Sequence, residues 1–99
     1  MSRTWVYLLT TENETRRSTV GCDCNPLRAL RKAQSKGKPW QLEIVLGPLT
    51  PGDAENCAVE WRESRGVRSR RRKGFEIALA RREAGDQTLQ VFDRRVRPT

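Results

Sequence analysis

The chain has 99 residues, with 20 Lys and Arg against 12 Asp and Glu, no His, and a formal net charge of +8. This length allows one domain with a modest core, since apolar residues make up only 35% of the chain. The lack of His removes the most common general base and metal ligand. The excess positive charge indicates a polyanionic partner, most often nucleic acid.

The cysteines exclude two further classes of protein. Cys22, Cys24 and Cys57 are too few for the four ligands of a structural zinc site, so we expect no zinc. They also do not suggest a disulfide framework, which favours a reducing, intracellular compartment, with the nucleus or nucleoid as options. The printed sequence contains no long apolar run, so we expect no signal peptide and no association with a membrane.

The first third of the chain predicts a hairpin followed by a helix. Residues 5–9 are aromatic, β-branched or aliphatic, which favours a strand. Turn-forming residues 12–15 then allow residues 16–20 to return antiparallel, ending at Gly21. Asn25 can cap a helix with Pro26 at its first position, and this basic helix runs to about residue 35.

The middle of the chain predicts a strand and a second helix. Residues 40–46 alternate, with Trp40, Leu42, Ile44 and Leu46 on one side, which is typical of a half-buried strand. Residues 47–52 contain two prolines and two glycines and predict a loop. Thr50 or Asp53 can then cap a helix whose apolar face carries Ala54, Cys57, Ala58 and Trp61.

The last third is dominated by charge. Residues 65–73 form the densest basic run and are expected to precede a short helix, with Gly74 as the interruption between them. Residues 88–92 predict a last strand, and residues 93–99 a loose tail. We therefore expect an α+β domain over residues 1–92. It would have a small antiparallel sheet of three strands plus a possible C-terminal strand, flanked by three helices, with all three tryptophans in the core.

Five segments, in order, resemble the GIY-YIG nuclease superfamily, and within it the nuclease subunit of structure-selective flap and junction endonucleases. The resemblance covers most of the chain. Its segments are Val6-Tyr7-Leu8-Leu9, Thr19-Val20-Gly21, Asn25 to Arg31, Lys38 to Leu46, and Ala58-Val59-Glu60-Trp61. It implies a GIY-YIG-like fold, branched or double-stranded DNA as substrate, and metal-assisted phosphodiester hydrolysis.

The resemblance also implies roles for individual residues. Glu60 would hold Mg²⁺ or Mn²⁺, and Tyr7 would assist attack by water. The second tyrosine of the family is replaced by Thr19, and its phosphate-binding arginine by Ala29. Lys32, one turn along the same helical face, could replace that arginine.

A groove for phosphates is expected from the basic residues of the first helix and the basic run. Its members would be Arg28, Arg31, Lys36, Lys38, Arg68, Arg70, Arg71, Arg72 and Lys73.

Two other functions remain open. The chain could be a catalytically inactive nucleic-acid-binding module, such as a subunit that assembles with a protein partner. It could also be a small basic protein that docks on an acidic partner. Each candidate residue also has a structural reading, because a tyrosine on a strand is commonly packed and a lone helical glutamate is commonly solvated.

Overall fold

The computed structural model describes residues 3–11 and 17–96, and it confirms the expected α+β class. The expected turn at residues 12–15 and the start of the return strand at residue 16 lie outside these ranges. Seven elements follow in the order β1 (Thr4–Thr11), β2 (Ser18–Asp23), α1 (Pro26–Gln34), β3 (Trp40–Leu49), α2 (Pro51–Arg62), α3 (Val67–Glu83) and β4 (Gln90–Asp93).

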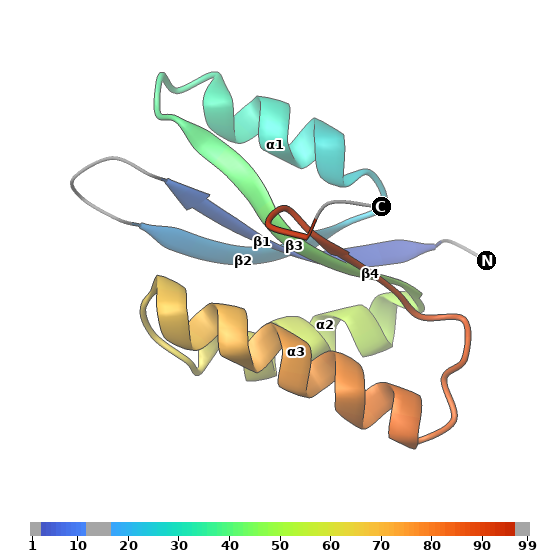
Figure 1. Ribbon diagram of the computed structural model, residues 1–99. Coiled ribbons are helices and arrows are strands. Elements are labelled where there is room, and N and C mark those ends of the chain that lie inside the picture. The colour runs from blue at the N-terminus through green and yellow to red at the C-terminus, as the bar shows by residue number, and fades with distance from the viewer. Residues whose placement is uncertain (1–2, 12–16, 97–99) are drawn as a thin grey trace.

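The four strands form one antiparallel sheet in the order β2-β1-β3-β4, so the fourth strand that the sequence left open is present. Helix α1 lies on one face of this sheet, and α2 and α3 lie side by side on the other (Figure 1). We call these the α1 face and the core face. The two faces differ in how completely they are covered.

The main core lies between the sheet and helices α2 and α3. Val6 and Leu8 of β1 point to it, as do Ile44 and Leu46 of β3 and the predicted apolar stripe of α2. Trp61 is completely buried at its centre. The expectation that all three tryptophans are core residues is wrong, because Trp5 and Trp40 are only partly buried.

A bulge in β3 corrects the predicted alternation of that strand. Leu8 pairs with Ile44, but Leu9 pairs with Leu42, so one extra residue of β3 lies between the two pairs. That residue is Glu43, which is 1% exposed. Leu42 consequently faces the α1 side, while Glu43 interacts with groups on the core side.

The basic run is helical from Val67 on, which corrects the expectation that a short helix begins only after Gly74. A single helix, α3, continues through Gly74 to Glu83. Gly74 allows a close approach between α2 and α3, because a Cβ there would lie 2.7 Å from Cζ2 of Trp61. The sequence pattern predicts a helix break at this glycine. In the structure the helix continues, and the missing side chain leaves room for Trp61 of α2.

The predicted helix caps are confirmed. Asn25 and Thr50 each accept a hydrogen bond from the third residue after them, Arg28 N at 3.2 Å and Asp53 N at 3.2 Å. Strand β3 extends to Leu49, so the loop expected from residue 47 is almost absent. Residues 93–96 also belong to the folded part, whereas a tail was expected there. In the described ranges, no helix has the length and apolar character needed to cross a membrane.

Candidate nucleic-acid interface

Tyr7 projects from β1 onto the α1 face, because its two neighbours in sequence point into the core. Its ring crosses Gly21 of β2, where a Cβ would lie 2.5 Å from the phenol oxygen. Burial raises the pKa of Tyr7 above its ordinary value, the negative groups of Asp23 and Cys22 raise it further, and Arg62 opposes them. The phenol is therefore protonated at neutral pH and suited to donating a hydrogen bond.

Glu60 lies on the flank of α2 that faces α3, on the core side of the sheet. Its carboxylate forms an ion pair of 3.1 Å with Lys73 Nζ, and its side chain is 54% exposed. With Ile77 and Ala80 of α3 it lines a hollow of about 330 Å³. The sheet and α2 therefore separate it from Tyr7, and the two residues do not form one site.

The other catalytic candidates lie on the same side of the sheet as Tyr7. Thr19 is exposed and pairs with Leu9, which places it on the α1 face. Lys32 is exposed on α1, and Ala29 is partly buried there. Glu60 alone lies on the opposite side.

The surroundings of Glu60 do not fit the divalent cation that the resemblance implies. Mg²⁺ is usually held by carboxylates together with other oxygen ligands. Here the carboxylate already faces the ammonium group of Lys73. Within residues 3–11 and 17–96, no group of three or more Cys, Asp or Glu side chains is arranged to hold a metal ion.

Two acids that the sequence analysis did not select lie nearer to Tyr7, at the edge of β2. Asp23 accepts hydrogen bonds from the Asn25 amide at 2.9 Å and from Arg28 Nη2 at 2.8 Å. The Asn25 hydrogen bond is the largest cause of its lowered pKa. Glu55 of α2 accepts a hydrogen bond of 3.7 Å from the thiol of Cys22. The pKa of this thiol is raised mainly by burial and next by the nearby Glu55 carboxylate. The Asp-x-Asn-Pro pattern was the available signal for Asp23, since such an acid commonly bonds the backbone two residues on.

Arg70, which was predicted to contact nucleic acid, has its guanidinium group hydrogen-bonded within the fold. Its Nε donates to the Ser64 carbonyl at 2.7 Å, and its Nη1 donates to the Ser18 carbonyl at 2.8 Å. Its own carbonyl accepts a bond of 2.6 Å from the Trp61 indole. Burial is the main reason that its pKa falls below the usual value, and Arg65 and Arg62 lower it further. This arginine joins α2, α3 and β2.

Arg71 is also held inside the protein, by two buried acids. Its guanidinium pairs with Glu43 and, at 3.2 Å, with Asp93 of β4. Arg94 and Arg95 reach the same Glu43 carboxylate at 3.1 Å and 3.2 Å. The Glu43 side chain thus organises three arginines from two distant parts of the chain.

These interactions create an arginine-lined hollow at the N-terminal end of α3. Val67, Arg68, Arg71 and Arg95 line a space of about 310 Å³, which we call the arginine hollow. The three guanidinium groups that line it stand against two carboxylates, those of Glu43 and Asp93, which leaves a surplus of positive charge among these five groups. The first turn of α3 contains no acidic residue and no side-chain cap, so the positive end of the helix adds to this surplus.

The remaining predicted cations do not complete one continuous groove with this hollow. Arg72 is exposed on α3, and Lys73 is paired with Glu60. The cations contributed by α1 and the turn after it lie beyond the sheet, on the α1 side, and Arg28 among them pairs with Asp23 (Figure 1). They are Arg28, Arg31, Lys36 and Lys38, and all four are exposed.

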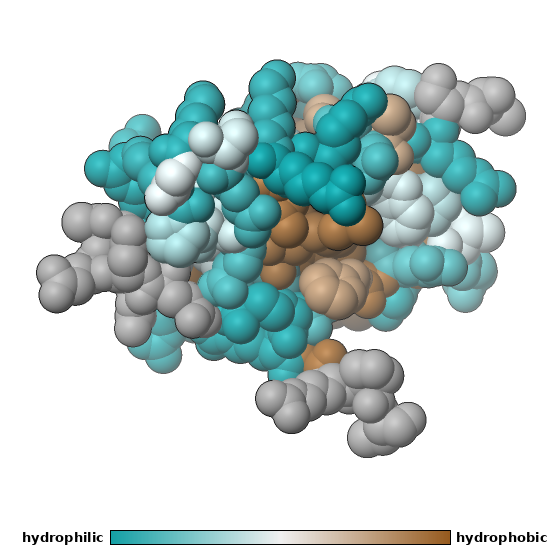
Figure 2. Space-filling model, turned by 90° about the horizontal axis from the view of Figure 1, so that it is seen from above, coloured by the Kyte–Doolittle hydropathy of each residue, from teal (hydrophilic) through white to brown (hydrophobic). Residues whose placement is uncertain are grey.

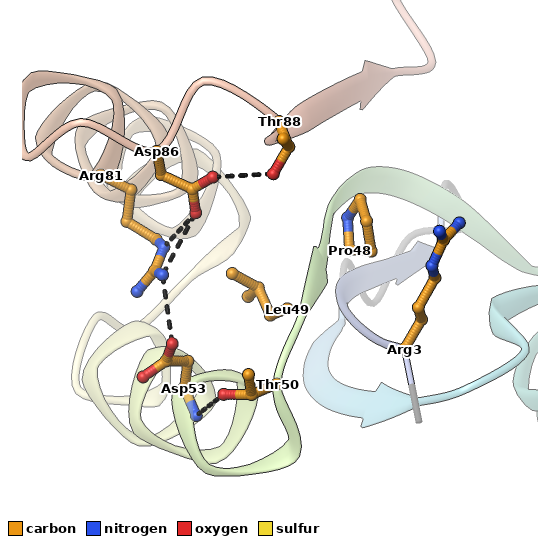
Figure 3. Close-up of a pocket in the computed structure, with 8 residues that line it drawn as sticks. All are labelled: Arg3, Pro48, Leu49, Thr50, Asp53, Arg81, Asp86 and Thr88. Carbon is orange, nitrogen blue, oxygen red and sulfur yellow. Dashed lines mark hydrogen bonds and ion pairs between the residues drawn. The ribbon is translucent and has the colours of Figure 1, made fainter. Parts of the chain in front are cut away.

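A second pocket, shown in Figure 3, is electrostatically balanced and has a structural role. Arg81 of α3 bridges Asp53 of α2 at 3.3 Å and Asp86 at 3.2 Å. Thr88 donates a hydrogen bond of 3.1 Å to Asp86. Arg3 stands on the opposite wall, away from this group (Figure 3). Both aspartates are therefore already paired with Arg81. The ion pair with Asp53 joins the start of α2 to the end of α3.

Comparisons of the chain with models of protein families, with curated proteins and with solved structures found no match. The candidate interface therefore stands on its own geometry. Of the sites described here, the arginine hollow has the clearest unbalanced charge.

Proposed function

We propose that this protein binds nucleic acid through phosphate contacts at the arginine hollow, on a GIY-YIG-like scaffold. The observation that carries this proposal is the surplus of positive charge around Arg68, Arg71 and Arg95. Arginine offers planar, paired donors that match phosphate oxygens. The buried acids fix two of these guanidinium groups, so little side-chain entropy is lost when a phosphate binds.

We favour DNA as the partner, in double-stranded or branched form, on the basis of the sequence resemblance. The order of strands and helices agrees with that resemblance, since a hairpin, a helix, a third strand and a helix pair follow one another. Binding without hydrolysis is the function that the residues support best. Tyr7 and Glu60 are on opposite sides of the sheet, and Lys73 neutralises the carboxylate.

The experiment is a titration of a fluorescently labelled DNA duplex at several salt concentrations, with two matched variants. Arg68→Ala and Arg82→Ala remove one exposed charge each, from opposite ends of α3. The slope of log K against log salt should decrease by about 1 in Arg68→Ala, as expected for one lost phosphate contact. It should be nearly unchanged in Arg82→Ala. Equal effects of the two variants would contradict an interface at the hollow.

Structure-selective endonuclease activity remains the second candidate, and one observation favours it. The Tyr7 phenol reaches across Gly21 to the edge of the sheet, where Asp23 and Arg62 influence its pKa. The same DNA panel, incubated with Mg²⁺, tests this candidate. Cleavage of flaps or junctions that disappears in Glu60→Gln would overturn the proposal of binding alone. Failure to bind DNA or RNA at low salt would instead indicate an acidic protein partner.

A further inference from the structure

The α1 face of the sheet is only partly covered, and an apolar hollow of about 420 Å³ remains beside α1. Its lining includes Trp5 of β1, Leu42 and Val45 of β3, and Phe92 of β4. Leu27 of α1 also lines it and is 57% exposed. Viewed from this side, an apolar patch is framed by hydrophilic side chains (Figure 2). We call this feature the aromatic hollow.

Two aromatic rings stand at the aromatic hollow on strands that are separated by β3. Phe92 is opposite Val45 in the register and is 53% exposed. The Trp5 ring packs against Gly47, where a Cβ would lie 2.6 Å from ring atom Cε3. This glycine lets the indole lie close to the sheet. Since neighbouring strands are about 4.8 Å apart, roughly 10 Å separates the strands that carry the rings.

The charges beside the aromatic hollow favour an anionic occupant. Helix α1 carries Arg28, Arg31 and Lys32 and has no acidic residue. Arg31 follows Leu27 by four residues, so it lies one turn further along the helix. A second copy of this chain would carry the same net charge of +8 and bring the same α1 cations to this surface, which opposes self-association through it.

We infer that the aromatic hollow binds unpaired bases of a single-stranded nucleic acid, with the α1 cations contacting the adjoining phosphates. Single-strand binding sites combine exposed aromatic rings, on which bases stack, with cations that follow the backbone. Both components are present here, and the Asn25 side chain adds a hydrogen-bonding amide to the lining. The inference rests on the proposed nucleic-acid function and assigns bases to one face of the sheet and duplex phosphates to the other.

The test compares a labelled oligothymidylate with a labelled duplex at the same salt concentration. Phe92→Ala should weaken binding of the single strand about tenfold, as expected for one lost stacking contact, and change duplex binding by less than about twofold. Phe92→Leu keeps an apolar side chain and should lose most of the same affinity. Leu27→Ala and Leu79→Ala form a matched pair, because the two leucines are 57% and 59% exposed on α1 and α3. Only the first should weaken binding of the single strand.

Tryptophan fluorescence provides an independent measurement. Oligothymidylate should quench the emission of the wild-type protein, and Trp5→Phe should remove most of that quenching. Trp40→Phe should retain the quenching. Trp61 should not contribute to it, because this side chain is completely buried.

Three results would overturn the inference. One is equal loss of single-strand and duplex affinity in Phe92→Ala, and another is quenching that persists in Trp5→Phe. The third is a wild-type dimer that Phe92→Ala converts to a monomer with single-strand affinity unchanged, since the face would then join two copies of the chain. Failure of the phosphate proposal is distinguishable, because it would appear as a duplex titration that does not respond to Arg68→Ala.

Discussion

Gly74 and Trp61 are in direct contact at the crossing of α2 and α3, with the indole occupying the position of the missing side chain. We expect Gly74→Ala to lower the free energy of unfolding by about 2 kcal/mol, although alanine is preferred over glycine in helices by about 1 kcal/mol. The reason is that the new methyl group would overlap a fixed aromatic ring. Chemical denaturation measures the effect.

Ser69→Ala is the control for this prediction, because Ser69 is exposed in the same helix. It should leave the protein unchanged or slightly more stable. A Gly74→Ala variant that is as stable as the wild type would show that the two helices can separate at little energetic cost.

Glu43→Gln should be among the most destabilising single substitutions in this protein. It would leave Arg71, Arg94 and Arg95 without the buried carboxylate that they share. Removing one partner of a buried ion pair typically costs about 3–5 kcal/mol. Urea denaturation measures the loss, and Glu76→Gln on the exposed side of α3 is the control that should have little effect. Similar stability of the two variants would contradict the role assigned to Glu43.

The stability of the first turn of α1 should depend on pH through the Asp23 carboxylate. Its pKa in the folded protein is lowered, mainly by the Asn25 amide and further by Arg28. The resulting stability is full above the unfolded pKa of about 3.9 and disappears as the pH falls through the lower folded value. Because the Arg28 pair is exposed and screened by solvent, the effect on stability should be small.

Amide hydrogen exchange in the first turn of α1 measures this effect. The wild type should lose protection there as the pH falls below 4, after correction for the intrinsic exchange rate. Asp23→Asn should have the lower protection already at neutral pH. An identical pH profile for both proteins would remove Asp23 from this role.

The three cysteines should react with a maleimide at different rates at pH 7.5. Cys24 is exposed and should be labelled first, whereas Cys57 is buried and should react only after unfolding. Burial raises the pKa of Cys22 and Cys57, so less of the reactive thiolate is present. Peptide mass spectrometry at increasing labelling times gives the order. Early labelling of Cys57 would contradict its buried position on the core-facing side of α2.

Local sequence signals were sufficient for most of the elements and not for the site. The strand pattern, the Asn25-Pro26 helix start and the apolar stripe of α2 each depend on neighbouring residues, and the structure agrees with them. The β3 bulge depends on the partner strand, so the sequence pattern could not show that Glu43 is buried.

The same limit applies to the candidate site. A basic run looks uniform in sequence, yet Arg70 and Arg71 serve the fold while Arg68 faces solvent. The partners that hold these two arginines are distant in sequence. Ser18 of β2 is 52 residues from Arg70, and Asp93 of β4 is 22 residues from Arg71. The separation of Tyr7 from Glu60 likewise depends on which face of the sheet α2 packs against.

The last strand has a consequence for synthesis of the protein. Asp93 and the two arginines after it complete the ion pairs around Glu43, which lies some fifty residues earlier in β3. While a nascent chain emerges from its N-terminus, Arg71 of α3 is available to that glutamate first, and Arg94 and Arg95 can join it only after β4 has left the ribosome. Release of β4 should therefore be the event that commits the whole domain to its native state.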